Sequence, residues 1–108
     1  MTDATFIKGP DGKYIGFIVE GHSGYAEAGY DIVCSSISTI MQATLHGLEN
    51  IIGVELNKVE NYREPYTMVM IPDHEANRSD VQLLLKIMHD VIESVADQYP
   101  RFASLTNV

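Results

Sequence analysis

The sequence lacks several features that are typical of secreted and membrane proteins. It contains one cysteine in 108 residues, so no intrachain disulfide can form. A single thiol suits the reducing cytoplasm, where disulfides are rare. No apolar run approaches the roughly 18–20 residues that span a bilayer, and the N-terminus lacks the basic and apolar regions of a secretory signal. We therefore expect a cytoplasmic protein without a membrane segment, folded as one domain over residues 1–108.

Positive charge is also scarce. Seven lysines and arginines face fifteen aspartates and glutamates, which gives a formal net charge of −8. Such a surface repels the phosphates of nucleic acids, so we expect no direct nucleic-acid binding. The acidity either attracts a basic partner or simply keeps the protein soluble, and composition alone leaves both interpretations open.

Patterns for metal and cofactor binding are missing as well. The four histidines include no His-x-x-x-His pair, and only one cysteine is available as a thiolate ligand. No glycine-rich phosphate loop leads from a predicted strand into a predicted helix in the required spacing. We expect neither a metal nor a cofactor.

Hydrophobic periodicity predicts the order ββαββα, with a possible last strand. Alternation favours strands, and apolar residues at a 3.6-residue period favour helices. Turn residues Gly9-Pro10-Asp11-Gly12 join the first two strands into a hairpin, and a capping-box pattern at Ser79–Gln82 starts the second helix. The predicted strands cover 5–7, 14–20, 54–60 and 66–71, the helices about 32–52 and 79–99, and a final edge strand or frayed tail 102–108.

These elements predict an α+β fold in which two helices pack on a mainly antiparallel sheet. So few strands and helices leave one sheet face or edge uncovered. Because uncovered edges and faces tend to find partners, we expect a homodimer.

The single cysteine lies where a thiol would be reactive. If Asp31 is the N-cap of the first helix, Cys34 falls in the first turn, near unpaired backbone N–H groups and the positive end of the helix dipole. Both favour thiolate over thiol, and the amides of Cys34 and Ser35 could hold an oxyanion. His22 could fold back from the preceding strand and act as a base. The alternative is a buried, inert cysteine and a surface histidine.

Several neighbours of this pair have two interpretations. Asp31 either orients His22 or only caps the helix. Ser35 and Ser38 are small polar residues in the first turns, suited to an oxyanion site or a substrate subsite, although serines are ordinary at a helix start. We expect the segment with Gly21, Gly24 and Gly29 to be a flexible loop, with these glycines as hinges of a lid that orders when a peptide binds.

One continuous run of the chain carries a specific resemblance. It combines Gly-His, an aromatic residue, Gly-x-Asp, an aliphatic pair, cysteine, two small residues, an aliphatic residue and serine. Residues 21–38, GHSGYAEAGYDIVCSSIS, closely resemble the signature of the bacterial ribosomal-processing cysteine protease family, Prp. Length, acidity and element order are also similar, so the likeness covers nearly the whole chain.

The resemblance implies a cytosolic, homodimeric cysteine endopeptidase. Family members remove a short N-terminal extension from a large-subunit ribosomal protein, next to a hydrophobic, aromatic stretch and just before a basic segment. On matching positions, Cys34 is the nucleophile, His22 the general base and acid, and Asp31 the corresponding acidic residue. Ser23 and Ser36 stand where the family usually has alanine, which affects the shape of the subsites.

Two other functions are compatible with the sequence. The chain could bind a ribosomal protein as a non-catalytic assembly factor, or Cys34 could serve as a redox sensor. A sensor usually has a resolving cysteine, and this chain has none.

Overall fold

The computed structural model describes residues 1–21, 28–61, 63 and 65–108, and the backbone alone for residues 28–31. The predicted order ββαββα is confirmed, and the last segment is a strand. In chain order the elements are β1 (Thr2–Lys8), β2 (Tyr14–Gly21), α1 (Ala28–His46), the π-helical turn η1 (Gly47–Ile51), β3 (Asn57–Asn61), β4 (Tyr66–Met70), α2 (Ser79–Gln98) and β5 (Ala103–Asn107).

The strands form one mixed sheet in the order β3-β4-β2-β1-β5. β1 and β2 form the expected antiparallel hairpin, which turns at Gly12 with a φ of +81°, a value that favours glycine. β4 joins the other side of β2 and pairs with β3, both antiparallel. β5 pairs with β1 in parallel, with Ala103 opposite Thr2. The sheet is therefore mainly antiparallel, as predicted.

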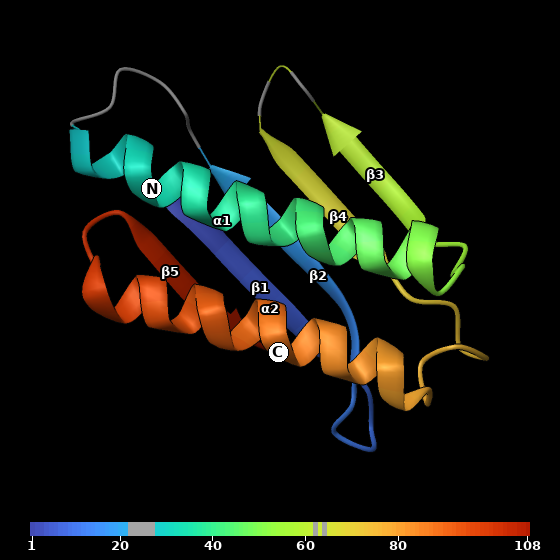
Figure 1. Cartoon of the computed structure of the whole chain (residues 1–108). Helices are drawn as coiled ribbons and strands as arrows, with labels where there is room; N and C mark the ends of the chain where they lie inside the picture. Colours follow the sequence, from blue (N-terminus) through green and yellow to red (C-terminus); the bar gives the residue numbers. More distant parts are fainter. Residues whose placement is uncertain (22–27, 62, 64) are drawn as a thin grey trace.

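Both helices lie side by side on the same face of the sheet (Figure 1). Alternate strand residues point into this layer and are buried, including Phe6, Phe17 and Val69. Fully burying a large apolar side chain contributes about 1.5–3 kcal/mol, so this layer dominates stability. From the helices, the core receives Val33, Ile37, Leu45, Val81, Leu85, Met88 and Ile92.

The opposite face of the sheet is covered by no element of the described chain (Figure 1). Residues between the buried strand positions point to this side, and Met68 pairs directly with Ile18. We call this group the open-face cluster; it consists of the half-buried residues Ile7, Ile18, Tyr66, Met68 and Met70.

Two contacts fix the helices to each other and to the hairpin. Gly47 allows a close approach of the helices, because a Cβ there would lie 3.0 Å from Cδ1 of Leu84 on α2. Gln82 on α2 accepts a hydrogen bond from the Tyr14 backbone N–H at 3.0 Å and donates to the Tyr14 carbonyl at 2.7 Å. The capping-box prediction is thus wrong: α2 begins at Ser79, its N-cap Arg78 makes no side-chain cap bond, and Gln82 serves tertiary packing.

The first helix differs from the prediction at both ends. It begins at Ala28 rather than near Ile32, and its last turn is π-helical. No proline interrupts residues 28–31, so the helix extends into the segment expected to be a loop, even though it includes Gly29, a poor helix former. No helix of the described residues has the length and apolar character needed to cross a bilayer.

Candidate active site

A cleft of about 260 Å³ opens between α1 and one end of the sheet, and Cys34 lines it. The cysteine is free, only partly buried and one of the residues that line the cleft. This position fits a nucleophile better than the inert, buried cysteine that the sequence also allowed. The described residues that line the cleft are Thr2, Val19, Glu20, Gly21, Cys34, Ile37, Ser38, Met41, Gln42, Glu60, Asn61, Pro65, Tyr66 and Thr67.

Helical periodicity places the cysteine at this position. Val33, Ile37 and Met41 are buried in the core beneath α1. Residues one position further along, Cys34, Ser38 and Gln42, follow each other at intervals of four and therefore form a row along the edge of the buried stripe. This row borders the cleft. The apolar stripe thus fixes the helix rotation, and the rotation presents the sulfur to the cleft.

Gly21 forms part of the sheet wall and needs to be glycine. Its φ is +142°, and a Cβ at this position would lie 2.8 Å from the Cα of Thr2. Its N–H donates to the Pro65 carbonyl at 3.1 Å. Gly21 is thus the last residue of a paired strand rather than a residue of a flexible loop. His22 directly follows this strand end in the sequence.

The charge around the cleft is negative. Glu20 and Glu60 line it and are both exposed. The described lining thus carries acidic side chains and no lysine or arginine.

The longer helix corrects the expected position of the thiol. Cys34 is the seventh residue of α1, one turn further along than predicted. In an α-helix, amides beyond the fourth residue bond to carbonyls in the preceding turn, so the amides of Cys34 and Ser35 are not the open donors that we expected for an oxyanion. The dipole effect also falls off within the first turn. The start of α1 therefore offers little stabilisation to a thiolate at Cys34.

The other predicted site residues separate into three groups. Ser38 lies in the cleft beside Cys34, whereas Ser35 lines a shallow depression on the outer side of α1, with Ile32 and Ser36. Asp31 lies within α1, so its interpretation as the N-cap is wrong. Gly29 is helical, so its role as a loop hinge is also wrong.

His22 and Gly24 lie outside the described residues. The predicted contact between His22 and Cys34 and the predicted lid motion therefore stay predictions. Thr2 and Gln42 were missed as cleft residues. The row at intervals of four from Cys34 could have indicated Gln42, whereas Thr2 reaches the cleft only through the pairing of β1 with the end of β2.

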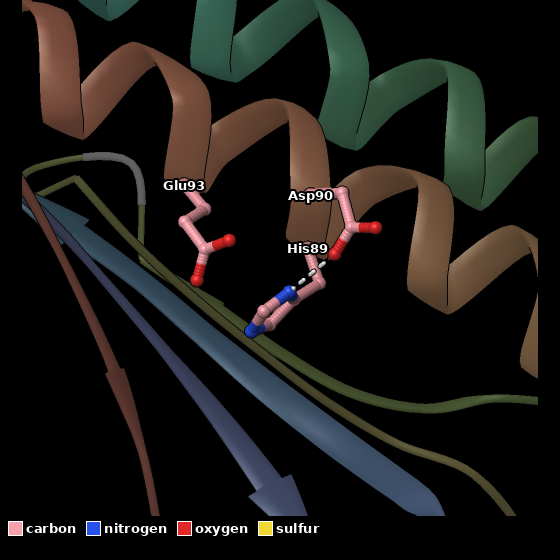
Figure 2. A group of neighbouring side chains, drawn as sticks. All are labelled: His89, Asp90 and Glu93. Carbon is pink, nitrogen blue, oxygen red and sulfur yellow. Dashed lines mark hydrogen bonds and ion pairs between the residues drawn. The ribbon is translucent and has the colours of Figure 1, made fainter.

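A second group of titratable side chains lies on α2, where Figure 2 shows His89 beside Asp90 and near Glu93. His89 is buried, and its ring makes an edge contact with Phe6 at 5.0 Å between centroids. Its Nδ1 lies 2.9 Å from the Asp90 carboxylate, and its Nε2 lies 2.9 Å from the side-chain oxygen of Asn107. These contacts tie α2 to β1 and β5, so we assign this group a structural role.

Comparisons with known proteins agree with a site that contains a cysteine. The family model for cysteine protease Prp matches residues 1–104. A ribosomal processing cysteine protease Prp from Staphylococcus aureus is 27% identical over 90 residues, which cover 82% of each chain.

Two crystal structures of S. aureus Prp have the same fold. The structure with a covalently linked product peptide has a TM-score of 0.88 at 19% identity, and the structure with a substrate peptide has a TM-score of 0.89 at 18% identity. Both alignments cover all of this chain and all of the other chain.

Proposed function

The chain belongs to the cysteine protease Prp family, and from this premise we propose that it removes an N-terminal extension from a large-subunit ribosomal protein. The observation that carries the proposal is the position of Cys34, partly exposed in the cleft between α1 and the sheet. The S. aureus relative is a ribosomal processing protease. The negative rim at Glu20 and Glu60 suits a basic ribosomal protein.

In the proposed reaction Cys34 is the nucleophile and His22 is the general base and acid. His22 takes the thiol proton, and the thiolate attacks the scissile carbonyl. The tetrahedral intermediate then collapses to a thioester as His22 protonates the leaving amine. Water, deprotonated by His22, hydrolyses the thioester and restores the thiol. Because Cys34 lies beyond the first helical turn, pairing with His22 carries most of the activation. Asp31 serves as an accessory acidic residue.

The test is incubation of the protein with a synthetic peptide that spans the N-terminus of the candidate ribosomal protein, followed by mass spectrometry. We expect two fragments, cut between the aromatic stretch and the basic segment. Cys34→Ala should lower the rate by three orders of magnitude or more. Its free energy of unfolding should change by about 1 kcal/mol or less, because the side chain is small and partly exposed.

The same experiment separates the protease from a non-catalytic assembly factor. A protein that binds the peptide tightly but leaves its mass unchanged would support the assembly factor. Cleavage by purified Cys34→Ala at the wild-type rate would show that Cys34 is not the nucleophile.

We further propose that the protein acts in the cytoplasm as a homodimer joined through the open-face cluster. This cluster presents apolar side chains on the sheet face that no described element covers, and such patches mark interaction surfaces. Met68→Lys at its centre should convert the dimer to a monomer in sedimentation experiments. Ile87→Lys, on the exposed side of α2, is the matched control and should leave the dimer intact. A Met68→Lys protein that sediments like the wild type would contradict this interface.

A further inference from the structure

The hydroxyl of Thr2 is buried beside the cleft and lacks a hydrogen-bond partner. Thr2 is 4% exposed and lines the same cleft as Cys34. Among the buried side-chain nitrogen and oxygen atoms of the described chain, Oγ1 of Thr2 alone is unpaired. Thr44, a second buried threonine, donates its hydroxyl to the Ile40 carbonyl at 2.8 Å. The missing partner is therefore specific to the threonine in the cleft wall.

An unpaired hydroxyl at this position is a cost for the free protein. Burial removes its hydrogen bonds to water, and nothing in the described structure replaces them. Valine has the same shape and is equally favourable in a strand. Valine would be the better residue if this position served packing alone. The presence of a hydroxyl therefore indicates a hydrogen-bond partner that is not part of the chain.

The backbone of Thr2 cannot move to find a partner. Its N–H donates to the Phe102 carbonyl at 2.9 Å, and the residue pairs with Gly21 on one side and Ala103 on the other. The side chain has one heavy-atom torsion, and a 120° rotation about χ1 moves the hydroxyl into the position that the methyl group or the hydrogen held. The hydroxyl can thus turn toward the cleft while the backbone of Thr2 stays fixed between two strands.

We propose that Thr2 is a substrate-binding residue whose hydroxyl forms a hydrogen bond with the backbone of the peptide bound beside Cys34. This inference rests on the proposed protease function and adds a contact on the sheet wall, opposite the helix that carries the thiol. A backbone contact fixes the register of an extended peptide against the sulfur without depending on its side chains.

Thr2→Val tests the contact, because it removes the hydroxyl and keeps the shape. With the peptide defined above, we expect kcat/KM to fall about tenfold, mainly through a higher KM, as one binding hydrogen bond is lost. The melting temperature should stay equal or rise, since an unpaired polar group is removed. Thr2→Ser retains the hydroxyl and should keep KM within about threefold. Thr44→Val is the control: it loses a formed bond away from the cleft, so the melting temperature should fall while KM stays unchanged.

Two outcomes would overturn the proposal. A wild-type KM for Thr2→Val would mean that water satisfies the hydroxyl, and a loss confined to kcat would place its partner on the catalytic groups. If the wild-type protein cleaves nothing, the proposed function fails instead. The contact is then tested by the Kd of the uncleaved peptide for Cys34→Ala with and without Thr2→Val, which should differ about tenfold.

Discussion

Cys34 and Ser38 lie one helical turn apart in the row of α1 that borders the cleft. Ser35, although adjacent to Cys34 in sequence, lines the outer side of the same helix. The sequence places both serines near the thiol, but helix rotation brings only Ser38 to the surface where a peptide would bind. We therefore expect substitutions of these two serines to affect cleavage differently, although the residues are chemically identical.

Ser38→Ala should lower kcat/KM about fivefold, the effect of one neutral hydrogen bond to the substrate. Ser35→Ala should cleave the peptide at the wild-type rate. Both serines are exposed, so each variant should unfold within about 0.5 kcal/mol of the wild type. Initial rates at several peptide concentrations give the comparison. Equal effects of the two substitutions would contradict the assigned helix rotation.

Gly21→Ala should both destabilise the protein and reduce cleavage. Its φ of +142° and the close Cα of Thr2 leave no room for a methyl group, and we expect a loss of about 1–3 kcal/mol. The displaced strand end leads directly into His22, so kcat/KM should fall about a hundredfold.

Gly53→Ala is the matched control for Gly21. Its φ is +73°, but a Cβ there meets nothing within 4 Å, and it lies outside the residues that line the cleft. It should cost about 1 kcal/mol and cleave normally. Urea unfolding and cleavage rates measured on the same samples separate strain from loss of function. A Gly21→Ala enzyme of full activity would show that the strand end does not position the reaction.

Cleavage of a peptide with a basic segment should slow as salt rises. Glu20 lies at the rim of the cleft and is exposed, and the screening length falls from about 10 Å at 0.1 M salt to 3 Å at 1 M. We expect kcat/KM to fall severalfold over this range. Glu20→Gln should flatten the dependence, whereas Glu55→Gln, an exposed residue outside the cleft lining, should not. If kcat/KM of the wild type did not depend on salt, electrostatic steering of the peptide would be contradicted.

Asp90 should contribute to stability in a pH-dependent way. Hydrogen bonds from the His89 ring and the Lys86 ammonium hold the pKa of Asp90 below its ordinary value of 3.8. A lowered pKa means that the contribution is complete above pH 3.8 and is lost as the pH falls through the lower value of the folded state. Between pH 6 and pH 3, urea unfolding should therefore show a larger loss of stability for the wild type than for Asp90→Asn.

The control for Asp90 is Asp97→Asn, which changes the charge by the same amount at an exposed position of α2. This variant should follow the wild-type pH profile. If Asp90→Asn and the wild type lose stability equally between pH 6 and pH 3, the contacts of Asp90 do not stabilise the fold.

Local patterns were sufficient for most of the architecture. The turn residues around Gly12 predicted the first hairpin, and the apolar periods predicted both helices and the element order. The start of α1 was wrong because Asp31 is a good N-cap in isolation, while Ala28 and the residues after it continue the helix. Cap signals in sequence do not reveal which of two possible starts the tertiary structure selects.

Contacts between distant residues could not be predicted. The parallel pairing of β5 with β1 joins segments about 100 residues apart, and nothing in residues 103–107 specifies that partner. Thr2 became a cleft residue through the same kind of pairing, with Gly21. Cys34 and Ser38 were found because they lie in a local motif. Of the sheet wall opposite them, Gly21 was named as a site residue and most of the others were not, because its members come from four strands.

The close approach of Gly47 to Leu84 joins the C-terminal end of α1 to α2. Cys34 lies thirteen residues before this anchor, about 20 Å along the axis at 1.5 Å per residue. A larger side chain at residue 47 would meet the flexible end of the Leu84 side chain, which would have to shift by a few tenths of an ångström to admit even a methyl group.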